Sequence, residues 1–285
     1  MRHIGRLRRR ARTPWQLVAG LVLVAVFWSV YWSWTSAYSQ EVFLPLWLGY
    51  ILTVDGLVQL RTASSFMTRR PWAFLALFPA SSAYWALHEL VNHVIRNWYY
   101  AAPARHGRLH WDVAQGITAS IVIPALYETL DLYRSVRRVR RLSGGRLPHV
   151  GPASVVLPFA GVVALALTLA FPREAFPLLW FIPFLLLDPL NYRAGRPSLL
   201  GEAAEGRWGT AAALALAGLT AGFFWELWNG GSAGYHWVYT IPHLQTAPHL
   251  FRMPLLGYLG YPPFAASTYA VCQALRLQSL PLVRP

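Results

Sequence analysis

Two glutamates each lie where an apolar run meets a polar loop, and each begins a short motif of the same composition. The residues of the two motifs are Glu89, Asn92, Trp98 and Tyr100 in the first copy, and Glu226, Asn229, Trp237 and Tyr239 in the second. Residues three apart on a helix share a face, so each motif presents a carboxylate beside an amide. A carboxylate in the last turn of a membrane helix is costly, and two in matching places indicate a duplicated site.

The chemistry of these motifs has two interpretations. If both line one pocket in the outer half of a membrane, partial removal from water favours a protonated carboxyl that can donate its proton. Glu89 and Glu226 are then the candidate catalytic acids, and the asparagines, tryptophans and tyrosines of the motifs are candidate substrate-binding residues. The asparagines position the acids, and Trp98 and Trp237 shield a cationic intermediate. In the alternative interpretation, Glu and Asn cap backbone donors of the loop, while Trp and Tyr lie at the level of the lipid headgroups.

Three further acidic residues form a possible second polar site: Asp55, Asp188 and Glu128. Asp55 and Asp188 lie one to two turns from the expected cytoplasmic ends of their helices, with arginines nearby. They are predicted either to cap or ion-pair the helix end, or to form a polar path through the membrane. Glu128 and Asp131 lie three apart, and we expect them to pair with the arginines that follow.

Seven of the nine histidines fall at or beyond the expected outer boundary of the membrane: His88, His93, His106, His110, His236, His243 and His249. A metal or haem site is conceivable there, but the spacings match no ligand motif. The single cysteine, Cys272, excludes an internal disulfide and a cysteine-based metal cluster. We therefore predict no metal and no cofactor.

The composition indicates that these residues belong to membrane helices. Of 285 residues, 55% are hydrophobic and only 13% are charged, which is too little charge for an ordinary soluble surface. The apolar residues occur in blocks of about 20, the length that crosses a bilayer. We predict eight spans at residues 14–34, 42–60, 72–94, 111–133, 152–171, 174–190, 208–229 and 251–275. In the last span, residues 251–275, Gly257 and Gly260 precede two prolines. This pattern predicts that the span begins with a kink and that a cavity lies near it.

Basic charge follows the expected topology. Every one of the 25 basic residues is arginine, and 20 of them fall in alternate loops and tails, with six in residues 1–13. Arginine collects on the cytoplasmic side, so this pattern predicts a multi-pass protein of the bacterial inner membrane with both termini cytoplasmic. The net charge of +14 therefore reports topology, and no nucleic-acid partner is expected.

The two halves of the chain resemble each other. A shift of 133 residues along the chain pairs Asp55 with Asp188. A shift of 137 pairs the Glu and Asn of the two motifs, and a shift of 139 pairs their Trp and Tyr. Glycines that permit close helix contact occur in both halves, at Gly56, Gly116, Gly222 and Gly257. We predict an all-α polytopic protein, a tandem 4+4 duplication of residues 1–141 and 142–285. Each copy has an even number of spans, so the copies run in parallel and are related by an axis near the membrane normal.

These motifs resemble segments of two groups of known proteins. The segment from Trp225 to Phe264, including Gly257 to Pro263, resembles a group of uncharacterised bacterial multi-span membrane proteins. More distantly, the order Glu89, Trp98, Tyr100, Pro124, Glu128 resembles the lycopene cyclase domain, although this chain has Glu128-Thr129 where that family has paired glutamates. The second resemblance implies tandem membrane units whose carboxylates protonate an isoprenoid.

Three functions follow as hypotheses. The first is a membrane enzyme acting on a lipid or isoprenoid by acid catalysis. The second is a transporter or lipid-binding protein whose halves move about a central site. The third is a structural or assembly subunit that packs on a membrane-protein partner. In the first two, the ligand is a membrane lipid or an apolar small molecule.

Overall fold

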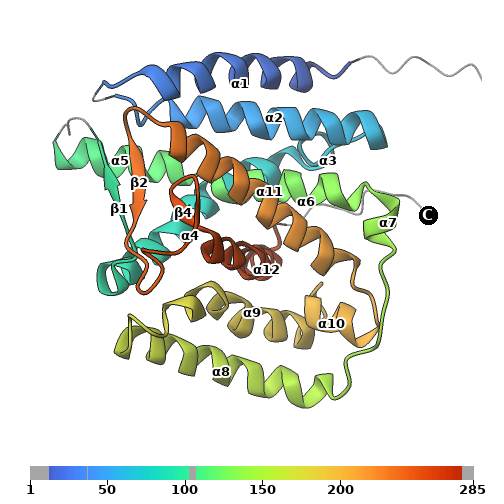
Figure 1. Ribbon diagram of the computed structural model, residues 1–285. Helices are drawn as coiled ribbons and strands as arrows, with labels where there is room; N and C mark the ends of the chain where they lie inside the picture. The colour runs from blue at the N-terminus through green and yellow to red at the C-terminus, as the bar shows by residue number, and fades with distance from the viewer. Residues whose placement is uncertain (1–12, 37, 103–106, 278–285) are drawn as a thin grey trace, which may run out of the picture.

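The computed structural model describes residues 13–36, 38–102 and 107–277, and this part of the chain is all-α with two short β-ribbons (Figure 1). The helices are α1 (Trp15–Ser33), α2 (Phe43–Thr62), α3 (Phe66–Arg69), α4 (Pro71–Ile95), α5 (Arg108–Ala119), α6 (Val122–Arg134), α7 (Arg137–Arg140), α8 (Val150–Ala170), α9 (Ile182–Arg193), α10 (Leu199–Ala204), α11 (Gly209–Gly231) and α12 (Tyr261–Ala274). Two 3₁₀ helices are η1 (Phe176–Trp180) and η2 (Leu255–Gly260), and the strands are β1 (Trp98–Ala101), β2 (His236–Tyr239), β3 (His249–Leu250) and β4 (Met253–Pro254). The arginines predicted to lie before the first span, at residues 1–12, fall outside the described residues.

Five helical stretches of the described residues are long and apolar enough to cross a membrane: Trp15–Ser33, Phe43–Thr62, Arg108–Arg134, Val150–Ala170 and Gly209–Gly231. They coincide with five of the eight predicted spans, so the prediction of long apolar helices is confirmed for these segments. The other three predicted spans are occupied by α4, by η1 with α9, and by η2 with α12. These stretches lack the length or composition of an unbroken span, and their crossing of the membrane stays a prediction.

Proline explains why the last predicted span is interrupted. Its first part is the 3₁₀ helix η2, which ends at Gly260, and α12 begins at Tyr261 with prolines in its first turn. Proline is tolerated there because the first backbone N–H groups of a helix have no partner within the helix. The predicted kink at this point is confirmed, and both glycines of η2 line a cavity described below.

Glycine brings two pairs of helices close together. A Cβ atom added at Gly56 would lie 2.6 Å from the backbone nitrogen of Leu17, so α1 and α2 are in contact along their backbones. A Cβ atom at Gly222 would lie 2.4 Å from the ring of Tyr261, which joins α11 to α12. At Gly116, Ser82 of α4 donates to the glycine's carbonyl oxygen at 2.7 Å, while no neighbouring element of the described chain lies within 4 Å of the position of a Cβ atom.

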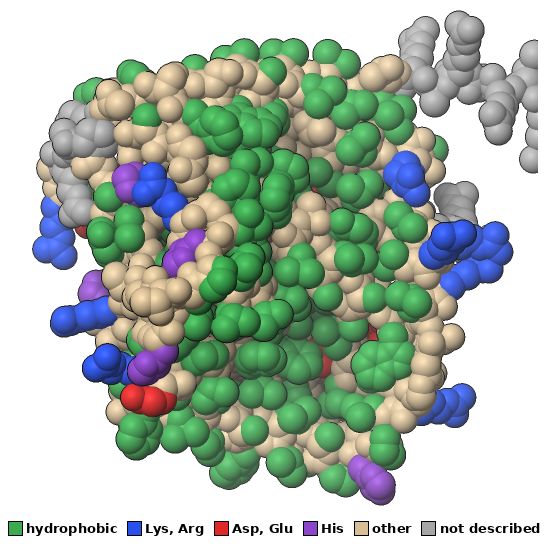
Figure 2. Space-filling view, in the orientation of Figure 1, with side chains coloured by type: hydrophobic (Ala, Val, Ile, Leu, Met, Phe, Trp, Pro, Cys, Tyr) green, Lys and Arg blue, Asp and Glu red, His purple; other side chains and the backbone are tan. Residues whose placement is uncertain are grey.

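Helices α1 and α2 lie along one side of the bundle and α8 and α9 along the other, with α6, α11 and α12 between them and α11 crossing obliquely (Figure 1). Hydrophobic side chains cover much of the face seen in Figure 2, while arginines gather toward its two edges. On α8, for example, Phe159 is 76% exposed. An apolar belt between two charged edges is compatible with a membrane protein.

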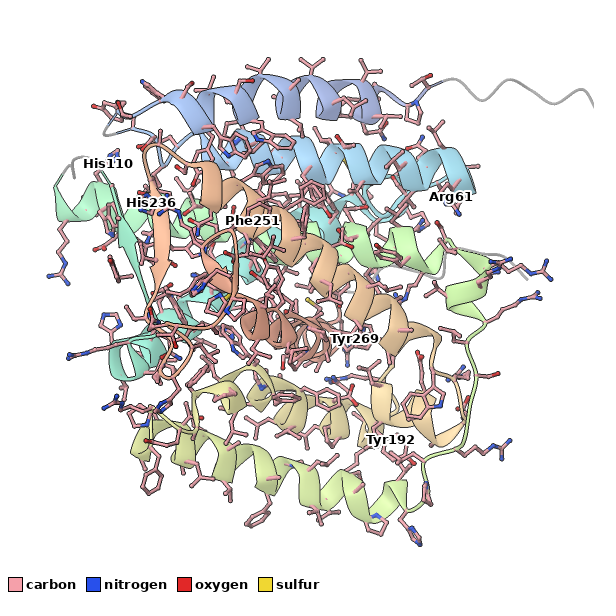
Figure 3. The ribbon with its side chains drawn as sticks, viewed as in Figure 1. Arg61, His110, Tyr192, His236, Phe251 and Tyr269 are labelled. Atoms are coloured by element: carbon pink, nitrogen blue, oxygen red, sulfur yellow. The ribbon has the colours of Figure 1, made fainter. Side chains whose placement is uncertain are left out.

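The two ends of the bundle carry different side chains. Figure 3 shows His110 and His236 near one end and Arg61 near the other. Helix α11 and helix α4 both end near the histidines, where β1 and β2 follow them (Figure 1). The motif residues therefore gather at one end of the bundle.

Candidate functional site

Strands β1 and β2 bring the aromatic residues of the two motifs together. They form an antiparallel ribbon in which Trp98 lies opposite Tyr239, and Tyr100 lies opposite Trp237. Side chains alternate between the faces of a strand, and directly opposed residues share a face. All four aromatic side chains therefore lie on one face of the ribbon, and all four line the same cavity.

The two asparagines fix the ribbon to the ends of its helices. Asn229 Nδ2 donates to the carbonyl oxygen of Trp237 at 2.9 Å, and Asn229 Oδ1 accepts from the Trp237 backbone nitrogen at 2.8 Å. Asn92 Nδ2 likewise donates to the carbonyl oxygen of Trp98 at 2.9 Å, and Asn92 Oδ1 accepts from the backbone nitrogens of Asn97 and Trp98. Both amides thus make the backbone contacts of the alternative interpretation.

Glu89 is half-buried, and three side chains donate to its Oε1 atom. The Tyr100 hydroxyl donates at 2.5 Å, the Trp98 Nε1 atom at 3.0 Å and the Trp85 Nε1 atom at 2.9 Å. Trp85 was not among the predicted residues, although its position one helical turn before Glu89 places it on the same helix face.

Glu226 is fully buried, and its two oxygens have different surroundings. Oε1 accepts from the hydroxyls of Tyr239 at 2.6 Å and Tyr261 at 2.7 Å. Trp237 Nε1 in turn donates to the Tyr239 hydroxyl at 2.8 Å. The other oxygen, Oε2, has no hydrogen-bond partner among the residues that the structure describes.

Tyr261 in the second motif occupies the role that Trp85 has in the first. The alignment that pairs Glu89 with Glu226 also pairs Trp85 with Gly222, which carries no side chain to donate to Glu226. The Tyr261 ring packs directly over Gly222 and supplies a donor from α12 instead. The sequence offered no signal for this contact, because Tyr261 lies on a different helix from Glu226 and far from it along the chain.

Burial keeps the two strand tyrosines protonated. It raises the pKa of Tyr239 well above its usual value of 10, and the Glu226 carboxyl beside it raises that pKa further. Burial and then Glu89 raise the pKa of Tyr100 in the same way. Both phenols are therefore donors at any physiological pH, and each glutamate is the acceptor.

Glu89 and Glu226 line one cavity of about 140 Å³. Aromatic rings make up most of the rest of its wall, and those outside the motifs are Phe43, Trp85, Trp180, Trp225, Tyr235, Tyr261 and Phe264. These rings come from α2, α4, η1, α11, α12 and the loop before β2, so elements far apart in the sequence enclose it. Tertiary packing therefore joins the two carboxylates, as a shared pocket requires.

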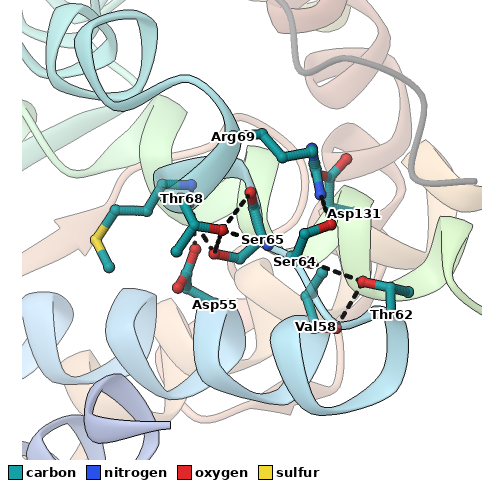
Figure 4. A network of polar contacts seen from close by, with 9 residues as sticks. Asp55, Val58, Thr62, Ser64, Ser65, Thr68, Arg69 and Asp131 are labelled. Carbon is teal, nitrogen blue, oxygen red and sulfur yellow. Dashed lines mark hydrogen bonds and ion pairs between the residues drawn. The ribbon is translucent and has the colours of Figure 1, made fainter.

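Asp55 and Asp188 cap short helices at the other end of the bundle. Asp188 accepts from the backbone nitrogens of Leu199 and Leu200 at 2.8 Å each, at the start of α10. Asp55 Oδ1 accepts from the backbone nitrogen of Met67 at 3.2 Å, at the start of α3 (Figure 4). The capping interpretation of both aspartates is therefore the one that the contacts match.

The ion pair near these caps joins Asp131 to Arg69 at 2.7 Å (Figure 4). We expected Asp131 to pair with an arginine that follows it. Arg134, three residues later, does act on it electrostatically, but the ion pair is with Arg69, which comes long before it in the chain, on α3. The reason is that α3 packs against the end of α6, which the order of residues does not reveal. Glu128 has no hydrogen-bond donor among the described side chains.

Metal ligands do not converge in the described part of the chain, where no three His, Cys, Asp or Glu residues are arranged to hold an ion. His88 is stacked between the rings of Trp85 and Trp180, and His110 contacts Glu41 at 2.8 Å. Of the histidines considered above, His106 lies outside the described residues.

Comparison of the chain with protein-family models, with curated proteins and with solved structures gives no match. These comparisons test neither of the two resemblances.

Proposed function

We propose that the protein is an integral membrane enzyme that acts on an isoprenoid or a similar apolar lipid by acid catalysis. The observation that carries this proposal is that Glu89 and Glu226 line one cavity whose other walls are mainly aromatic. A carboxyl group in such a cavity can protonate a carbon–carbon double bond without water competing for the cation. The faces of Trp and Tyr rings stabilise the positive charge that forms. The resemblance to the lycopene cyclase domain points to the same class of substrate.

The hydrogen bonds support different roles for the two glutamates. Two tyrosine hydroxyls donate to Oε1 of Glu226, which leaves the unpartnered Oε2 as the atom that carries the proton. Glu226 is then the acid that protonates the double bond. A second double bond attacks the cation to close a ring, and Glu89 accepts the proton that the ring loses. The reaction is an isomerisation with one proton added and one removed, and it needs no redox partner.

The cavity size supports a reaction at one end of the substrate. A cavity of about 140 Å³ is close to the roughly 150 Å³ that holds a benzene ring in an engineered protein. One ring-sized end group fills it, and the rest of an isoprenoid chain extends into the lipid.

The test compares substrate conversion in purified wild-type protein and in the Glu226→Gln variant, with an isoprenoid bearing terminal double bonds in D₂O. We expect a loss of conversion of about 10² to 10⁴-fold, the usual size of a general-acid contribution. Glu205→Gln is the matched control, because Glu205 is exposed and far from the cavity wall. In cells, Glu226→Gln and Glu89→Gln must reproduce the lipid and pigment profile of a deletion strain. An unchanged profile for both variants, in a strain whose deletion alters it, contradicts the proposal.

A lipid-binding protein or transporter is the second candidate function. Side chains of the protein already donate to Oε1 of both glutamates, and such hydrogen bonds can hold the wall of a binding cavity in place without any reaction. In that case a lipid co-purifies unchanged with the protein and no deuterium enters it. Incorporation of one deuterium into a cyclised product supports the enzyme.

We also propose that the chain is a tandem duplication with eight membrane spans, residues 1–141 and 142–285. Matched contacts support it: the two asparagines hold their strands alike, and Ser65 and Ser198, which the alignment of Asp55 with Asp188 also pairs, cap α3 and α10 alike. The register of β1 and β2 also fits a two-fold axis, because exchanging Trp98 with Trp237 exchanges Tyr100 with Tyr239. The proposed location is the bacterial inner membrane with both termini cytoplasmic, and the proposed partner is a membrane lipid or apolar small molecule.

A further inference from the structure

A second group of buried carboxyls lies away from the cavity, near the other end of the bundle. Asp55 on α2 and both Glu128 and Asp131 on α6 are fully buried. Phe43, which lines the cavity, is the first residue of α2, and Asp55 lies in the second half of the same helix. At a rise of about 1.5 Å per residue the two positions are about 18 Å apart, so this group is separate from the cavity.

The hydrogen bonds of this group leave three oxygen atoms without a donor. Asp131 pairs with Arg69, and Asp55 Oδ1 accepts from the backbone of Met67 (Figure 4). Asp55 Oδ2 and both oxygens of Glu128 have no donor in the described part of the chain. Asp55 and Glu128 act on each other electrostatically, and both carboxyl groups are fully buried. A carboxylate that is buried without a donor is costly while it is ionised, so neutralising Glu128 requires a proton.

The charges around the pair lead to the same requirement. The charged groups that act on Glu128 are Asp55 from α2, Arg69 from α3 and Asp131 from α6, and Arg134 from α6 acts on Asp131. Three carboxyls therefore meet two guanidinium groups, and Arg134 is shared with Glu202, so at least one negative charge is in excess in a buried place. From α12 the Tyr269 ring lies 5.6 Å from the Arg134 guanidinium, and from α10 the partly exposed Glu202 acts on Arg134. One bound proton neutralises the buried group, and a buried unpaired charge is costly.

We propose that Asp55 and Glu128 form a proton-binding site that holds one proton between their carboxyl groups. Asp188, the corresponding aspartate in the second half, shows what a simple helix cap looks like. Both oxygens of Asp188 accept from backbone N–H groups, and Ser267 stands where the duplication would place a second carboxyl. The proton site thus belongs to the first half alone. It does not depend on the proposed reaction in the cavity.

The test is an infrared measurement of protonated carboxyl groups in the purified full-length protein, identified by their carbonyl band and its shift in D₂O. In wild-type protein we expect a band from the Asp55–Glu128 pair, and Glu128→Gln removes it. The amide of the new glutamine donates to Asp55 in place of the proton, so the fold is kept. Potentiometric titration of the same samples shows one bound proton fewer at neutral pH.

Two variants make the assignment unambiguous. Asp55→Asn retains the acceptor for the Met67 nitrogen and places a donor toward Glu128, so it removes the same band even if Glu128→Gln does not fold. Asp188→Asn is the matched control, and it leaves the band in place. The Glu226 carboxyl gives its own band, lost only in Glu226→Gln, so either proposal can fail without the other. A carboxyl spectrum identical in wild type, Glu128→Gln and Asp55→Asn overturns the proton site.

Discussion

At the scale of single residues, two glutamates in matching motifs have unlike surroundings. Glu226 is fully buried with one oxygen free of donors, whereas Glu89 is half-buried with three donors on one oxygen. On α4, Trp85 donates to Glu89. The paired position on α11 is Gly222, which has no side chain, and Tyr261 of α12 packs over it and donates to Glu226 instead. Similar sequences therefore give two carboxyls with different hydrogen-bond surroundings, as the different roles proposed for them require.

The strand tyrosines make the folded protein sensitive to alkaline pH. Burial raises the pKa of Tyr239 and Tyr100 in the folded state well above 10, while the unfolded chain has the ordinary value of about 10. The stabilisation from each protonated phenol is fully present below about pH 10 and is lost as pH rises through the folded pKa. Above about pH 10, each such tyrosine lowers the free energy of unfolding by about 1.4 kcal/mol per pH unit.

We predict that Tyr239→Phe makes the alkaline pH dependence of the free energy of unfolding less steep by about 1.4 kcal/mol per pH unit, the share of one tyrosine. The variant also loses a hydrogen bond to Glu226, worth about 1 kcal/mol at any pH, so the slope and not the level is diagnostic. The measurement is denaturant unfolding in detergent micelles, followed by tryptophan fluorescence across the alkaline range. A slope equal to that of wild type would contradict the assignment of the raised pKa to Tyr239.

At the scale of elements, close helix packing and a broken helix build the cavity. The 3₁₀ helix η2 places its glycines on the cavity wall, and α12 then begins at Tyr261, whose ring covers Gly222 of α11. The 3₁₀ helix η1 likewise ends at Trp180, which also lines the cavity. The breaks in these two helical segments thus place the aromatic rings of Trp180 and Tyr261 on the cavity wall.

We predict that Gly222→Ala destabilises the protein by about 1 to 3 kcal/mol, the usual cost of inserting a methyl group into a packed contact. The new Cβ atom would lie 2.4 Å from the Tyr261 ring, so this ring must move and its hydrogen bond to Glu226 lengthens. Gly116→Ala is the control, because its Cβ atom meets no described atom within 4 Å and alanine favours a helix. Thermal unfolding in detergent compares the two, and equal stability would show that the α11–α12 contact is not tight.

At the scale of the whole molecule, the charged edges and the apolar belt agree with a protein embedded in a membrane (Figure 2). The number of crossings has a sharp test. Between Arg138 and Gln245 the proposed topology has three spans, whereas only two of the five long apolar helices lie between them. An odd number of spans puts the two residues on opposite sides, and an even number puts them on the same side.

We predict that a membrane-impermeant thiol reagent labels Gln245→Cys on intact cells and labels Arg138→Cys only after the membrane is opened. Both positions are exposed, and the wild-type background is clean because its single cysteine, Cys272, is fully buried. Labelling of both variants from the same side would reject the eight-span topology. Labelling of Arg138→Cys alone on intact cells would place the termini outside.

Local patterns in the sequence predicted much of the fold. The apolar runs predicted the five long helices, because hydrophobic length is a property of contiguous residues. Two glycines followed by two prolines predicted the break before α12. The motifs located the two carboxylates and their four aromatic neighbours, since the residues of each motif lie close together along the chain.

Only the tertiary structure decided which of these residues meet. The pairing of β1 with β2, the donation from Tyr261 to Glu226 and the burial of Asp55 near Glu128 each join residues from elements that are far apart in the chain. Such contacts depend on how helices pack, and Gly222 and the break before α12 control that packing through shape rather than composition. The sequence alone therefore determined helices long and apolar enough to cross a membrane and two acidic aromatic motifs, and packing alone made the motifs one cavity and buried a separate group of carboxyls in the second half of α2 and on α6.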